Sequence, residues 1–71
     1  MNETGNKLVD QFLAELDARL KPDDRRVLTL LEVDEMTIVE IARMTDWSVA
    51  KVKVRAHRAR TALRRVLGEF L

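Results

Sequence analysis

The residues of this chain whose types and spacing suggest chemistry are basic. Between Ser48 and Val66 the sequence has seven lysines and arginines and no acidic residue, although the 71-residue chain has a net charge of only +1. Seven like charges on one segment repel one another, and an anionic partner would remove that cost. A charge run is often only a solvated helix face, but a run of one sign favours a site for a polyanion.

Other kinds of chemistry have little support in the sequence. His57 is the only histidine and the chain has no cysteine, so a metal site would have to be completed by carboxylates alone. Asp23 and Asp24 could imitate a catalytic carboxylate pair, but acidic residues at the start of a helix are explained by the helix dipole. Because the sequence shows neither a nucleophile–base pair nor a phosphate-binding glycine loop, we expect no enzyme activity and no bound cofactor.

Helical periodicity runs through the chain and predicts four helices and no strand. A first helix is expected from about Asn6 to Leu20, with apolar residues spaced three or four apart at Leu8, Phe12, Leu13, Leu16 and Leu20. Pro22 ends this helix and begins a second one, whose apolar residues are Val27, Leu28, Leu30 and Leu31. The acidic stretch from Glu32 to Glu35 opposes the helix dipole and marks the end of the second helix.

The second half of the chain predicts a helix-turn-helix. Thr37 and Glu40 have the spacing of a capping box, so a short third helix should run from there to about Met44. After a turn at residues 45–47, Ser48 caps a fourth helix that should extend to about Val66 and be weakened or closed by Gly68. Its apolar stripe is Val52, Ala56, Ala59, Leu63 and Val66. The expected fold is therefore an all-α, four-helix domain that contains a helix-turn-helix.

The fourth helix also has a face opposite its apolar stripe. At about 100° per residue, that face carries Ala50, Val54, His57, Arg58, Thr61 and Arg65. Lys51 and Lys53 flank the stripe, while Arg55 and Arg60 lie nearer the core edge, from which their long stems can still reach phosphates. A recognition helix enters the major groove by its N-terminal half, so the outer residues of that half would meet the base edges.

Residues 20–67 resemble region 4 of bacterial sigma factors, especially of the extracytoplasmic-function group. Leu20–Val33 is similar to the opening of that region, Thr37–Met44 to its supporting helix, and Ser48–Arg65 to its recognition helix. The most specific part is the pattern Val-Lys-x-Arg-x-x-Arg-Ala-Arg from Val52 to Arg60, because it follows a capped helix at the right distance.

The resemblance implies a module for promoter recognition. In that family the domain binds the −35 element of double-stranded promoter DNA, contacts the β flap of RNA polymerase, and is often covered by an anti-sigma factor. The family's base-reading positions correspond to Lys53, Val54, His57 and Arg58. Its phosphate contacts correspond to Thr37, Ser48, Lys51 and Arg55.

Four residues depart from the family's pattern. Asp46 stands where the turn usually has glycine, and Trp47 stands where an aliphatic residue is usual. Ala56 replaces a larger apolar residue, so the fourth helix could pack more closely there. Val54 occupies a position often held by serine, so the base preference of other members cannot be copied to this chain.

The remaining expectations concern the chain as a whole. Residues 1–6 are expected to form a flexible lead, and residues 7–71 a region 4-like domain. This domain is either part of a longer sigma factor, which we favour, or a free-standing sigma-like module. The apolar runs are too short for a membrane span, and the lack of cysteine favours a cytoplasmic protein. The sequence shows no heptad repeat that would form a dimer, so we expect a monomer. Two alternatives stay open: a sigma-like interaction module that binds a regulatory protein without reading DNA, and a dimeric helix-turn-helix repressor.

Overall fold

The computed structural model describes residues 3–71, with side chains from Lys7 onward. This part of the chain forms α1 (Glu3–Arg19), α2 (Pro22–Glu32), α3 (Ile38–Thr45) and α4 (Val49–Phe70), and it contains no strand. The predicted all-α fold with four helices and a helix-turn-helix, made by α3 and α4, is confirmed. None of these helices is both long enough and apolar enough to span a membrane.

Two helix ends differ from the sequence prediction. α1 begins at Glu3, so residues 3–6 of the expected flexible lead form its first turn, while residues 1–2 lie outside the described residues. The predicted end of the fourth helix near Val66 is wrong, because α4 continues through Gly68 to Phe70. Glycine costs a helix conformational entropy but keeps its backbone hydrogen bonds, and the ring of Phe70 packs edge-on against Phe12 with centroids 5.7 Å apart.

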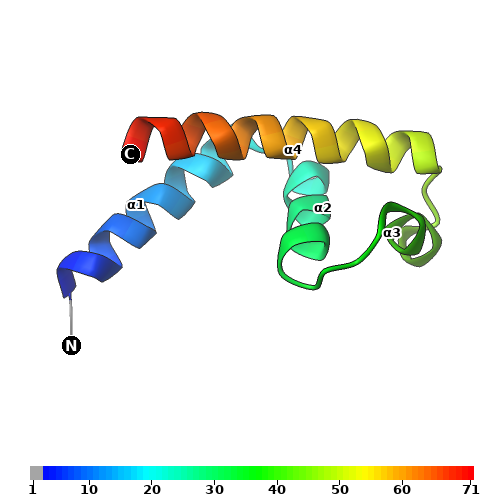
Figure 1. The fold of residues 1–71 in the computed structure, drawn as a ribbon, viewed down its shortest axis with the longest axis horizontal. Helices are drawn as coiled ribbons and strands as arrows, with labels where there is room; N and C mark the ends of the chain where they lie inside the picture. The colour runs from blue at the N-terminus through cyan, green and yellow to red at the C-terminus, as the bar shows by residue number, and fades with distance from the viewer. Residues whose placement is uncertain (1–2) are drawn as a thin grey trace.

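α4 is the element that holds the fold together. It runs along most of the molecule, with the first part of α1 extending past its C-terminal end, and α1, α2 and α3 all pack against one side of it (Figure 1). Two buried clusters line that side. One consists of Leu16, Leu20, Leu28, Ala59 and Val66, and the other of Val27, Ile41, Ala42, Val52 and Ala56. The predicted stripe of α4 is therefore confirmed as its buried side, with Leu63 partly buried at the edge of the first cluster.

Local hydrogen bonds fix where α4 begins. In the capping box of α3, the Glu40 backbone N–H donates to the Thr37 hydroxyl at 3.1 Å and the Thr37 backbone N–H donates to the Glu40 carboxylate at 2.9 Å. The turn after α3 is made by Asp46, which has the left-handed conformation (φ 60°, ψ 24°) that aspartate tolerates better than most residues. Ser48 then caps α4 by accepting from the Lys51 backbone N–H at 3.1 Å. These predicted caps fix the residues at which α3 and α4 begin.

Candidate nucleic-acid interface

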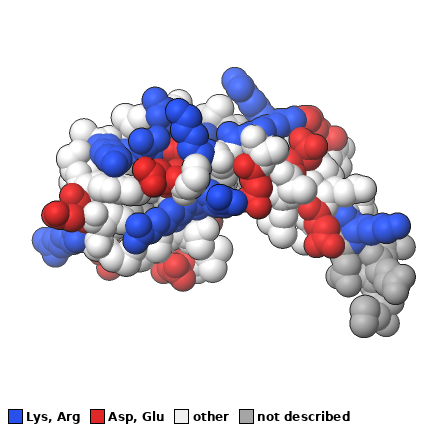
Figure 2. Space-filling model, turned by 180° about the vertical axis from the view of Figure 1, so that it is seen from behind, with Lys and Arg blue, Asp and Glu red and all other residues white. Residues whose placement is uncertain are grey.

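The four residues predicted to read bases lie together on the exposed face of α4. Lys53, Val54, His57 and Arg58 are all exposed, Val54 by 48 %. No described helix covers this face, because the other three pack against the opposite side (Figure 1). Lys and Arg side chains gather along the edge of the molecule that α4 forms, with acidic side chains interspersed (Figure 2).

The basic residues of α4 fall into two groups, and the first group consists of the two arginines that the sequence placed nearer the core edge. Arg55 pairs with Asp24 and Arg60 pairs with Glu32, each at 3.2 Å, so both guanidinium groups are bound to α2. Within residues 7–71, where side chains are described, the others have no carboxylate within ion-pair distance; these are Lys51, Lys53, Arg58, Arg64 and Arg65. Most of the basic residues in this second group lie on the outward half of the helix, where an anionic partner can reach them.

The contact between Arg55 and Asp24 differs from what the sequence suggested for both residues. The Asp24 side chain is only 6 % exposed and that of Arg55 21 %. Sequence reasoning explained Asp24 by the dipole of α2 and assigned Arg55 to a phosphate. The feature of the sequence that could have indicated this ion pair was the position of Arg55 near the core edge of the fourth helix. Its phosphate contact stays a prediction, and it would use guanidinium N–H donors that the single contact to Asp24 leaves free.

The other predicted phosphate contacts have different surroundings. Ser48 accepts from the Lys51 backbone, which leaves its own hydroxyl hydrogen free to donate. The Lys51 ammonium lies 4.2 Å from the centre of the Trp47 ring, so Trp47 covers the second cluster and also holds a cation. At Thr37, the capping hydrogen bond from the Thr37 backbone lowers the pKa of Glu40. A carboxylate that stays charged beside Thr37 opposes a phosphate there.

Two further surfaces form where α1 meets α4. The basic cleft, of about 590 Å³, is lined by Arg19, His57, Arg58, Thr61, Ala62 and Arg65. The apolar groove, of about 250 Å³, is lined by Leu8, Val9, Phe12, Leu67, Phe70 and Leu71. Sequence reasoning found the apolar residues of the first helix, but it could not show that Leu8 stays 55 % exposed while Leu16 is buried.

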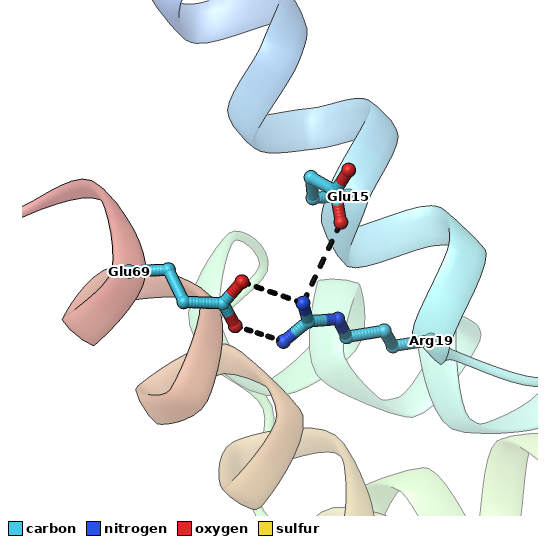
Figure 3. A network of polar contacts seen from close by, with 3 residues as sticks. All are labelled: Glu15, Arg19 and Glu69. Carbon is cyan, nitrogen blue, oxygen red and sulfur yellow. Dashed lines mark hydrogen bonds and ion pairs between the residues drawn. The ribbon is translucent and has the colours of Figure 1, made fainter.

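An ion-pair network joins the two helices between these surfaces. Arg19 of α1 donates through both terminal nitrogens to the Glu69 carboxylate of α4, in one contact at 2.7 Å, and also lies 3.5 Å from Glu15 (Figure 3). The hydrogen bond from Arg19 lowers the pKa of Glu69, and Glu69 in turn raises the pKa of Arg19. Among residues 7–71, whose side chains are described, no group of three His, Cys, Asp or Glu side chains is placed to hold a metal ion.

Comparison with known proteins gives one match. The family model described as "Sigma-70, region 4" matches residues 10–63, which include all of α2 and α3 and most of α4. No curated protein and no solved structure gives a significant match.

Proposed function

Because the chain belongs to the sigma-70 region 4 family, a family of DNA-binding domains with a general role in recognising the −35 promoter element, we propose that the exposed face of α4 reads that element in the major groove. The observation that carries this proposal is the set of basic side chains without a carboxylate partner on the one face of α4 that no described helix covers. The family is not one of enzymes.

The chemistry of the exposed residues suits the edges of base pairs. Arg58 can donate two hydrogen bonds to the O6 and N7 acceptors of a guanine, and Lys53 can donate to the same atoms. Val54 is short enough for close approach and can contact the methyl group of a thymine. His57 can donate or accept. We therefore expect a preferred site that contains guanine next to thymine, with Arg58 as the main source of discrimination.

Selection from a randomised duplex library tests this proposal. The full chain should enrich one short sequence, and the enriched duplex should bind more tightly than a scrambled one at the same salt concentration. Arg58→Ala should lower the affinity for the enriched duplex by about 1–3 kcal/mol and relax the preference at one base pair. Arg64→Ala removes the same charge from the same helix and should leave the preference unchanged. Equal enrichment of all sequences would refute base reading.

The polymerase contact belongs to the same proposal, and we assign it to the apolar groove. This groove lies at the end of α4 distant from Ser48, so a polymerase segment could occupy it while the N-terminal half of α4 stays in DNA. We propose further that the chain acts in the cytoplasm as a monomer. We also propose that it belongs to the extracytoplasmic-function group of sigma factors.

A substitution at an exposed position of the groove separates the two contacts. Leu8→Asp should abolish co-purification with a β flap fragment and leave binding to the enriched duplex unchanged, because Leu8 is half exposed and lines the groove at the C-terminal end of α4. An anti-sigma protein is the competing occupant. Capture of such a regulator by a chain that binds no DNA, even in the presence of polymerase, would favour an interaction module instead.

A further inference from the structure

Half of the basic cleft has no role in the function proposed so far: His57 and Arg58 are assigned to bases, whereas Arg19, Thr61 and Arg65 are not. Its lining includes three arginines, one histidine and the hydroxyl of Thr61, and it includes no carboxylate. Arg19 comes from α1, and the other lining residues come from α4. The cleft therefore brings hydrogen-bond donors from two helices to one place, which is the chemistry that binds a phosphate.

The position of the cleft along α4 decides which part of a DNA duplex would reach it. The major groove is about 12 Å wide, and a helix that rises about 1.5 Å per residue fills that width with about eight residues. A groove that begins at Ala50 thus ends near Arg58. Thr61 and Arg65 lie on the same outward face about one and two turns further along. With α4 placed in this way, they would face the sugar–phosphate backbone beyond the bases.

Arg19 can bind the same backbone if its guanidinium exchanges its carboxylate partners for a phosphate. Its side chain is 35 % exposed, and both carboxylates that bind it are about half exposed. Exposed ion pairs contribute little to stability, so a phosphodiester that offers the same paired acceptors can replace Glu69. Because an arginine side chain stays protonated in proteins, the guanidinium remains charged throughout the exchange.

We propose that the basic cleft binds the DNA backbone on the far side of the major groove, with Arg65 and Thr61 of α4 and Arg19 of α1 as its phosphate contacts. This inference rests on the proposed function and extends the DNA surface to α1. Glu69 competes with the phosphate for Arg19, so the ion pair between α1 and α4 weakens DNA binding. These contacts add affinity without sequence preference.

Fluorescence anisotropy over a range of salt concentrations tests the cleft, with the enriched duplex and its scrambled control as probes. Arg65→Ala should lower the slope of log K against log salt by about 0.9, which is about an eightfold loss of affinity at 0.1 M salt. The loss should be the same on both duplexes. Arg64→Ala is the matched control, because Arg64 is the neighbouring arginine and does not line the cleft. Equal slopes for the two variants would refute the proposal.

Glu69→Gln distinguishes a phosphate contact at Arg19 from a purely structural one. Arg19→Ala should weaken binding in either case, since it also removes the link between α1 and α4. Glu69→Gln breaks the same link but leaves Arg19 available, so it should tighten binding if Arg19 contacts a phosphate. Weaker DNA binding by the Glu69→Gln variant would overturn the proposal that Arg19 contacts a phosphate. If the wild-type chain did not distinguish the two duplexes, the proposal that α4 reads bases would be refuted. The proposal for the cleft would still be tested, because it depends on the salt slopes and not on sequence preference.

Discussion

The ion pair between Arg55 and Asp24 gives the sharpest test of how this domain is built. Replacing Arg55 with Met keeps the apolar stem and removes the charge, so Asp24 remains in its 6 % exposed site without a partner. Loss of one partner of a buried pair costs about 3–5 kcal/mol, and we expect the lower end because Arg55 itself is 21 % exposed. A 71-residue domain has a total stability of about 4–11 kcal/mol, so this change should remove much of it.

The molecule contains its own control for this experiment. Arg60 and Glu32 also join α4 to α2 with an N–O distance of 3.2 Å, but their side chains are 48 % and 47 % exposed. Arg60→Met should therefore cost less than about 1 kcal/mol. Urea denaturation followed by circular dichroism measures both variants on one scale. A full cycle with Asp24→Asn should show coupling of about 0.5–3 kcal/mol between Arg55 and Asp24.

Two outcomes would contradict this reasoning. If Arg55→Met and Arg60→Met lowered the free energy of unfolding equally, burial would not be what distinguishes the two ion pairs. If Arg55→Met left the stability unchanged and lowered the salt slope of DNA binding by about 0.9, Arg55 would be the phosphate contact that the sequence predicted.

Two other predictions concern single elements. Because the Thr37 backbone hydrogen bond lowers the pKa of Glu40 below its ordinary value of 4.5, the stability that the charged form contributes is present above pH 4.5 and is lost as the pH falls below that value. Unfolding of Glu40→Gln, measured across this range, should depend less on pH than that of the wild type; an unchanged pH profile would show that the capping box does not form in solution. Gly68 lies inside α4 with open space around an added Cβ, so Gly68→Ala should raise the stability by about 0.5–1 kcal/mol, seen as a higher Tm. A lower Tm would mean that the last turn of α4 is not helical in solution.

Periodicity and capping chemistry were enough to predict most of the fold. The buried stripe of α4 follows from the spacing of Val52, Ala56 and Ala59, because each side chain on a helix returns to the same face after three or four residues. The caps at Thr37 and Ser48 involve residues three apart in the sequence, so their hydrogen bonds are local. The end of α4 could not be predicted from neighbouring residues, since it depends on the packing of Phe70 against Phe12 of α1, which is far away in the sequence.

The candidate site was less predictable for the same reason. The exposed positions of α4 follow from the helical repeat, and Lys53, Val54, His57 and Arg58 lie on the face expected for them. The partners that Arg55, Arg60 and Arg19 find on other helices lie 28 to 50 residues away in the sequence. The helical repeat places Arg55 and Arg60 near the core edge of α4, but which carboxylate each arginine binds depends on how α1 and α2 pack against α4.

These ion pairs change what can be inferred from the seven basic residues of α4. Seven like charges on one helix would repel one another, and in the sequence alone the only remedy is an anionic partner. In the fold, Asp24 and Glu32 of α2 offset two of those charges, so the repulsion that DNA would relieve comes from the remaining five. The two offset arginines also fix how α4 is rotated on α2, because both pairs join these same helices. The same basic run thus has two tasks: its inner arginines hold α4 in place, and its outer residues are left exposed for the polyanion.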